Sequence, residues 1–417
     1  MKNHKERQFL INESLSLLNR LDMVQPFALN TPMVRAAAIS ALAQDAINKH
    51  MDGIKKEIRQ KVGDFITWLK RQTEISPEKA QAEYAMLKLR FNNLLDQLDI
   101  FADVLLQRGE HNTGTWVAGL DVLAADSLKV KGNYFTLPPM ICFLERGHGA
   151  AIRRARTRLP GGDENPVAVI QVPRERMVGS GIASSLIHEV GHQGSELLGL
   201  TTSIREEIKQ KYPNQRPWDL LNRWLNEILS DFWAMANIGI SATYGLMSVV
   251  SLPSYFVFRI ATDAPHPFPW IRVQISIAFG RYLYPHQQWN DLESQWEKLY
   301  PVADLPIEKK QIIQELKQIL PFFAKLVANH TPKSLNGLVL KDIFPYSERQ
   351  PEVLLANFRK WQQDKQQMIN ARPTLVFAVV GQAKASGLIN AREESKLLTK
   401  LLTQWALDRA KNYCLVK

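Results

Sequence analysis

The stretch Leu186-Ile187-His188-Glu189-Val190-Gly191-His192 carries the pattern HExxH. Residues four apart share one face of an α-helix, so His188 and His192 can offer their imidazoles to a single metal ion. Glu189 then lies where a general base would meet the attacking water. We expect the helix to begin after Ser180 and to end near Leu198. Two polar histidines on an exposed helix face are the alternative interpretation.

A second segment adds carboxylates to this pattern. Glu227 lies 35 residues after His192 (227 − 192 = 35), and Asp231 follows it four residues later. A catalytic zinc takes three protein ligands and keeps one open position, so Glu227 can be the third ligand. Asp231, one helical turn further on, can accept a hydrogen bond from the far ring nitrogen of a ligating histidine. We expect this second helix to be opened by Pro217.

The two segments together resemble the gluzincin metallopeptidases, the thermolysin-like family. In that family the HExxH helix is followed by a ligand segment that Asn226-Glu227 and Ser230-Asp231 match as they stand. The resemblance covers only the two motif helices. It implies a zincin-like core, zinc as the cofactor, Glu189 as the general base and Asp231 bonded to His188.

Other residues near the motif do not fit a different zinc site. A metzincin would need glycine at 195 and histidine at 198, where the chain has Ser195 and Leu198. Glu196 lies about 12 Å along the helix axis from His188, at about 1.5 Å per residue, so one ion cannot reach both. Gly191 costs about 1 kcal/mol in a helix relative to alanine, which predicts close approach of another backbone at this position.

A proline-bound loop supplies candidates for the remaining chemistry. In Pro265-His266-Pro267-Phe268-Pro269, alternate prolines stiffen the chain around His266, and Arg272 follows shortly after. Hydrolysis of a carbonyl needs a donor for the developing oxyanion. We therefore assign His266 and Arg272 as candidate catalytic residues, with Tyr255 as a further candidate donor. A plain packing loop is the alternative.

The run Pro166-Val167-Ala168-Val169-Ile170-Gln171-Val172-Pro173 predicts a β-strand, because it is short, apolar and bounded by prolines. Gluzincins place upstream of the HExxH helix an edge strand that pairs with extended substrate. We therefore expect a peptide to pair with this strand through main-chain hydrogen bonds. An ordinary buried strand is the alternative interpretation.

Composition sets wider bounds on class and compartment. The 417-residue chain is 45% hydrophobic, which suffices for a sizeable core, and its net charge of +11 permits several anionic partners without establishing any. No nucleic-acid-binding motif occurs. Cys142 and Cys414 have no CxxC partner and fit reduced cysteines of a cytosolic protein. The charged N-terminus has no apolar signal core, so we expect a cytoplasmic protein.

Residues 232–258 contain no charged side chain. A spanning helix needs about 20 predominantly apolar residues, so length alone leaves a membrane span open. Glycine, proline and serine interrupt the segment, and we favour a buried core helix that breaks near Pro253.

Helical patterns dominate both ends of the chain. We predict a mainly α protein with a small β component: an N-terminal helical region at 1–110 with a bundle of about four helices, a zincin-like catalytic core at 111–300, and a C-terminal helical region at 301–417. From 111 to about 175 the chain is richer in glycine, proline and β-branched residues, and the β component is expected there. The helical flanks can dock a protein partner.

These observations predict a zinc metallopeptidase that hydrolyses peptide bonds in a peptide or protein substrate, with Zn²⁺ held by His188, His192 and Glu227. Two alternatives remain open. The first is a zinc hydrolase of non-peptide amides or esters, which would lack the substrate-pairing edge strand. The second is a helical scaffold protein in which zinc is structural or lost.

Overall fold

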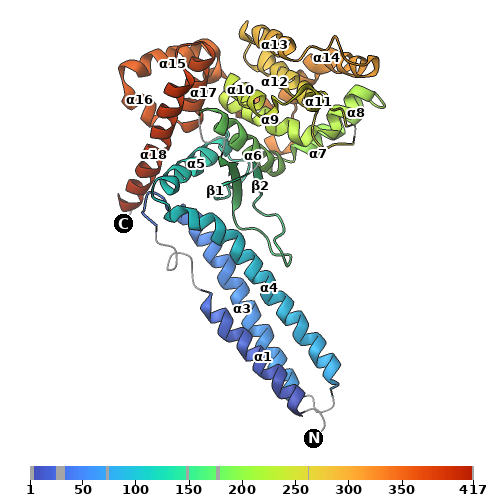
Figure 1. The fold of residues 1–417 in the computed structure, drawn as a ribbon, viewed down its shortest axis with the longest axis vertical. Helices are drawn as coiled ribbons and strands as arrows, with labels where there is room; N and C mark the ends of the chain where they lie inside the picture. Colours follow the sequence, from blue (N-terminus) through green and yellow to red (C-terminus); the bar gives the residue numbers. More distant parts are fainter. Residues whose placement is uncertain are drawn as a thin grey trace. The chain divides into compact units, whose positions relative to one another are not determined.

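The structure is a computed structural model that describes residues 4–24, 33–71, 75–146, 150–174, 179–261 and 263–415. It is mainly helical with one small sheet, which confirms the predicted balance of secondary structure (Figure 1). The chain divides into two compact units. Unit 1 comprises Met1–Ala118, Pro138–Ile141 and Arg153–Val169, and unit 2 comprises Gly119–Leu137, Cys142–Ile152 and Ile170–Lys417. The three-part division at residues 110 and 300 stays a prediction.

Unit 1 is built on three long helices, α1 (His4–Met23), α3 (Ala41–Arg71) and α4 (Pro77–Leu106), that pack against one another. Apolar residues at helical spacing, such as Ile54, Ile58 and Val62, supply the buried stripe of α3. Ser76 caps α4 by accepting a hydrogen bond from the backbone N–H of Lys79, with proline at the first helical position. The short 3₁₀ turn η1 (Gln107–Gly109) follows.

The helix α5 (His111–Leu128) corrects one expectation. We expected the small β component somewhere between 111 and about 175, because glycine, proline and β-branched residues become more common there. Val117, Leu120 and Ala124 are instead buried at a spacing of three to four residues, which is the helical period. The β-rich composition applies only to the later part of that region.

A three-stranded sheet holds the predicted strand. Its members are β1 (Met140–Glu145), β2 (Ala151–Arg153) and β3 (Ala168–Pro173), in the order β1-β3-β2. The strand expected from the apolar run is confirmed as β3. Its expected place at a sheet edge is wrong, because β3 has a neighbour on both sides and cannot accept a substrate strand. A strand that is buried on both faces has a continuous apolar sequence. That sequence does not tell whether the strand lies in the middle of a sheet or at its edge.

Unit 2 consists mainly of helices. In order they are α6 (Gly181–Leu197), α7 (Leu200–Lys211), α8 (Arg216–Arg223), α9 (Leu225–Ile238), α10 (Ile240–Val250), α11 (Ser254–Val257), α12 (Pro269–Leu283), α13 (Gln288–Leu299), α14 (Ile307–Ala328), the 3₁₀ turns η3 (Lys333–Leu335), η4 (Leu340–Ile343) and η5 (Tyr346–Arg349), and α15 (Pro351–Gln363), α16 (Lys365–Asn370), α17 (Pro373–Ala385) and α18 (Ala391–Leu415). Cys142 is buried and free of a disulfide, whereas the side chain of Cys414 lies outside the described part.

The two motif helices, α6 and α9, pack closely against each other. A Cβ added at Gly191 would lie 2.8 Å from the Cα of Ser230, and one added at Gly194 would lie 2.4 Å from the Trp233 ring. These two glycines therefore let the backbone and a large indole of α9 approach the face of α6. The predicted reason for Gly191 is confirmed, and the expected start and end of the motif helix agree with α6.

The second motif helix differs from the expectation. Pro217 lies at the start of α8, but α8 ends at Arg223, and Glu227 belongs to the first turn of a new helix, α9. The uncharged segment that follows is also interrupted earlier than expected, at Gly239, whose φ of +57° marks the junction of α9 and α10. No helix of the described residues is both long enough and apolar enough to span a membrane.

Candidate metal centre

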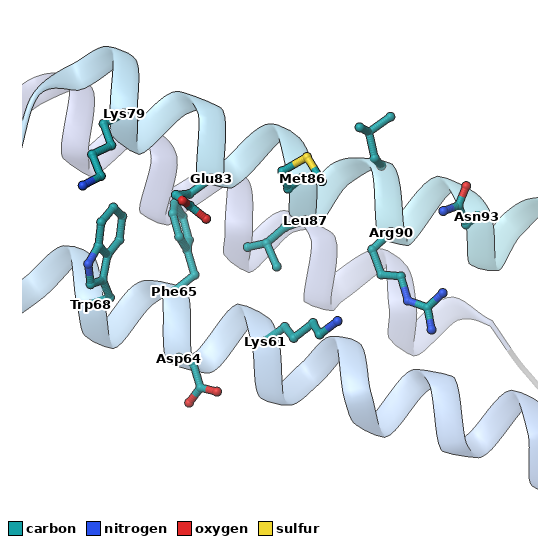
Figure 2. A pocket seen from close by; sticks show the side chains of 11 residues that line it. Lys61, Asp64, Phe65, Trp68, Lys79, Glu83, Met86, Leu87, Arg90 and Asn93 are labelled. Atoms are coloured by element: carbon teal, nitrogen blue, oxygen red, sulfur yellow. The ribbon is translucent and has the colours of Figure 1, made fainter. Parts of the chain in front are cut away.

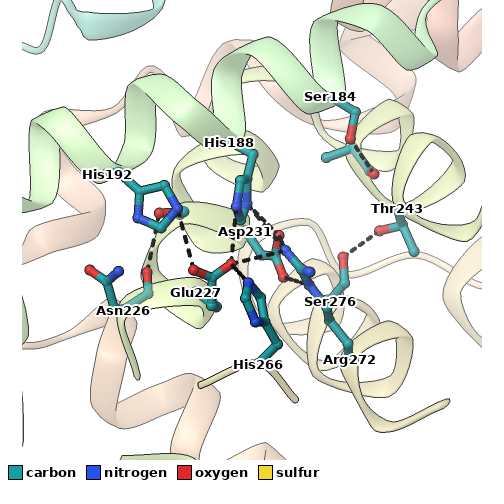
Figure 3. Close-up of polar contacts among 12 residues, drawn as sticks. Ser184, His188, His192, Asn226, Glu227, Asp231, Thr243, His266, Arg272 and Ser276 are labelled. Carbon is teal, nitrogen blue, oxygen red and sulfur yellow. Dashed lines mark hydrogen bonds and ion pairs between the residues drawn. The ribbon is translucent and has the colours of Figure 1, made fainter. Parts of the chain in front are cut away.

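The two motif helices bring three potential ligands together. His188 and His192 project from α6 and Glu227 from α9, and one ligand atom from each lies within 4.8 Å of the others (Figure 3). The His188 Nε2 lies 3.3 Å from Glu227 Oε2, and the His192 Nε2 lies 3.5 Å from Glu227 Oε1. The described residues contain no other group of three or more histidine, cysteine, aspartate or glutamate side chains placed this way.

This spacing fits one four-coordinate ion. Two nitrogen or oxygen ligands about 2.05 Å from a tetrahedral zinc lie about 3.3 Å apart. The two measured separations to Glu227 are close to that value. Two imidazoles and one carboxylate are also the ligand set of a catalytic zinc site with an open position. The three side chains are each 12–13% exposed, so the group is mostly but not completely buried.

Asp231 fixes the orientation of one ligand. Its Oδ1 lies 2.8 Å from the His188 Nδ1, and because a carboxylate can only accept, the imidazole donates this hydrogen bond (Figure 3). When a bound ion takes the place of the proton on Nε2, the lone pair of that nitrogen is directed toward the ion beside Glu227. The expected partnership between Asp231 and His188 is present in the structure.

Arg272, at the first turn of α12, holds Asp231 from the other side. Its Nε and Nη2 donate to the two carboxylate oxygens at 2.7 and 2.9 Å, a bidentate pair. Its Nη2 also lies 3.7 Å from Glu227 Oε2. The sequence offered Arg272 as a catalytic group but gave no sign of this pair, because the two residues lie 41 positions apart on different helices. The contact favours a role in positioning Asp231.

Charge pairing governs ionisation in this buried cluster. Burial by itself would lower the pKa of His188, but the carboxylates of Asp231 and Glu227 raise that pKa to about 9. Burial would raise the pKa of Glu227, but the neighbouring histidines and Arg272 lower it to about 2. The pKa of Asp231 is likewise held well below its usual range, against the effect of burial, by Arg272 and His188. Both carboxylates are therefore ionised at neutral pH, as metal binding and histidine orientation require.

Glu189 behaves differently from the other two acids. Its side chain is buried, with 7% of the residue exposed, and burial is the main reason that its pKa is raised. The charges of His188 and Glu227 also act on it, which places Glu189 within electrostatic range of the ligands. The pKa of Glu189 is therefore shifted in the opposite direction to that of Glu227, which makes Glu189 the more easily protonated of the two acids.

His266 lies at the exposed side of the group. Its Nε2 is 3.4 Å from Glu227 Oε2, and its side chain is 58% exposed (Figure 3). The loop before it is held where the indole N–H of Trp224 donates to the carbonyl of Ala264, at 3.2 Å, while Phe268 packs edge-on against the same indole. The structure thus brings His266 beside the three ligands. Tyr255, also considered as a donor, is an exposed residue of α11 whose ring packs against Phe256.

Comparison with known proteins found no matching family model, curated protein or solved structure. The site is therefore interpreted from its own geometry and from the motif resemblance.

Proposed function

We propose that this protein is a zinc-dependent hydrolase of peptide bonds, with His188, His192 and Glu227 as ligands and Glu189 as the general base. The observation that carries the proposal is the convergence of one ligand atom from each of these three residues within 4.8 Å, with Asp231 bonded to His188. A zinc ion bound there would polarise the scissile carbonyl and lower the pKa of a water molecule.

Glu189 supplies the proton transfers. Because burial raises the pKa of its carboxyl, Glu189 can take a proton from the attacking water and later give it to the leaving amine. A fully ionised carboxylate such as Glu227 would be a poor acid for the second transfer. The raised pKa therefore separates the acid–base residue from the ligand.

His266 is proposed as the donor to the oxyanion. It is exposed on the open side of the ligands and stands on a loop that prolines and Trp224 constrain. Oxyanion donors act when they are fixed before the reaction begins. Arg272 is proposed to act through Asp231, because its Nε and Nη2 both donate to that carboxylate.

The partial exposure of the three ligands supports a catalytic site over a closed structural one. The central position of β3, however, removes the strand that we expected to pair with peptide. This observation favours a second candidate function, hydrolysis of non-peptide amides or esters by the same groups. Cleavage assays separate the two.

The test uses zinc-loaded wild type and Glu189→Gln. Each is incubated with an unstructured peptide library, read by mass spectrometry, and with a panel of small amides and esters. We expect wild type to cleave peptides and Glu189→Gln to retain zinc but lose cleavage, because glutamine cannot exchange the proton. Cleavage of the small amides or esters alone would support the second candidate. Equal activity of both proteins would contradict the role of Glu189.

A further inference from the structure

Unit 1 contains a groove between α3 and α4 that the proposed hydrolase site does not use. The groove encloses about 990 Å³ and has an apolar floor made by Phe65, Trp68 and Leu87. Figure 2 shows these side chains pointing into the space between the two helices, while α1 runs behind both. Among the described residues of unit 1, these three helices share one core, and no fourth helix covers the face away from α1.

Apolar side chains beside the groove are exposed. Met86 and Leu89 on α4 have 64% and 55% of their surfaces in solvent, at a position where the helix could have carried polar residues. From Lys79 to Asn93 the lining of α4 extends about 21 Å, at about 1.5 Å per residue. A helix of about four turns fits along this length and would bury these side chains.

The acidic and basic side chains around the groove differ in whether they have an ion-pair partner. Lys61 pairs with Glu57 at 2.7 Å, and Arg90 pairs with Asp163 at 2.8 Å, so both cations already have an acidic partner. Asp64 on one wall and Glu83 on the other have no ion-pair partner among the described residues. Asp64 and Glu83 both line the groove, Glu83 beside Phe65 between the helices and Asp64 on the outer side of α3, while Lys79 lies at one end near Trp68 (Figure 2).

We propose that this groove binds an amphipathic helix of a partner protein, with an apolar stripe on Phe65 and Trp68 and with basic residues opposite Asp64 and Glu83. The complementary charges select the partner's chemistry, since a like-charged helix would place carboxylates against carboxylates. An indole in the floor is the type of residue that contributes most to such a contact.

Two synthetic helices of about 18 residues test the proposal on the full chain. Both carry the same leucine stripe; one has lysine and the other glutamate along its flanks. Binding of the fluorescein-labelled peptides is followed by anisotropy. We expect wild type to bind the basic peptide about 10-fold more tightly than the acidic one. The net charge of +11 would by itself favour the acidic peptide. A preference for the basic peptide therefore has to come from the groove and not from the charge of the whole protein.

Charge reversal provides the decisive variant. Asp64→Lys/Glu83→Lys should invert the preference, and both positions are exposed, so the fold should tolerate the change. The matched control is Asp52→Lys/Asp103→Lys, which makes the same charge change at exposed positions of α3 and α4 outside the groove. Trp68→Ala should weaken both peptides about 10-fold. The proposal is overturned if wild type prefers the acidic peptide, if neither peptide binds, or if the control inverts the preference equally.

Discussion

Replacing Gly191 by alanine tests whether the close packing of α6 on α9 sets the geometry of the metal centre. The new Cβ would lie 2.8 Å from the Cα of Ser230, whereas ordinary contact begins at 3.4 Å, so α9 must move by about 0.6 Å (3.4 − 2.8 = 0.6). Overpacking of this kind costs about 1–3 kcal/mol. The higher helix propensity of alanine returns about 1 kcal/mol. Gly63→Ala on α3 is the control, because nothing lies within 4 Å of its added Cβ and only the propensity gain remains.

The free energy of unfolding is measured by urea titration with far-UV circular dichroism. Because the propensity gain is common to both variants, Gly191→Ala should be about 1–3 kcal/mol less stable than Gly63→Ala. Glu227 lies one turn before Ser230 and would move with it. Metal–ligand distances are typically held within about 0.2 Å, so zinc affinity by chelator competition should fall about 10- to 100-fold. If Gly191→Ala were as stable as the control and bound zinc like wild type, the close approach would not set the site.

Three further predictions address individual residues. Asp231→Asn should weaken zinc binding about 10- to 100-fold in chelator competition, because His188 loses its carboxylate partner; unchanged affinity would contradict that role. His266→Ala should lower turnover about 100-fold with zinc retained, whereas His286→Ala, a histidine on another loop, should not; equal effects would exclude His266 as a donor. Burial would raise the pKa of Asp163, but Arg90 and Gln97 lower it. Its carboxylate therefore stabilises the fold above the unfolded pKa of about 3.9, and this contribution is lost as the pH falls below that value. Thermal melts between pH 7 and pH 3 should therefore show a smaller loss for Asp163→Asn than for wild type, and parallel losses would count against the ion pair.

The placement of each pair of residues on one helix face was predictable because the spacing within a pair is a property of a single helix. His188 and His192 share a face of α6 through the i, i+4 rule alone, and Glu227 and Asp231 share a face of α9 in the same way. Gly191, placed inside the motif, also predicted that another backbone lies close. Local periodicity was therefore enough to predict which residues share a face within each of the two helices.

Features that depend on distant contacts were not predictable. The bidentate pair of Arg272 with Asp231 joins residues 41 positions apart, and no local pattern announces it. The central place of β3 depends on pairing with strands from elsewhere in the chain, and one of them, β2, is only three residues long. The break between α8 and α9 occurs at Trp224, inside the segment that we expected to form one helix from Pro217 to Asp231.

Zinc content is the most direct measurement of the central claim that His188, His192 and Glu227 together hold one ion. The purified chain and its variants are loaded with zinc, freed of weakly bound metal and analysed for the element. We expect about one zinc per chain in wild type and in Glu196→Ala, an exposed acid of the same helix, and little in Glu227→Ala. Full zinc occupancy in Glu227→Ala would contradict the claim.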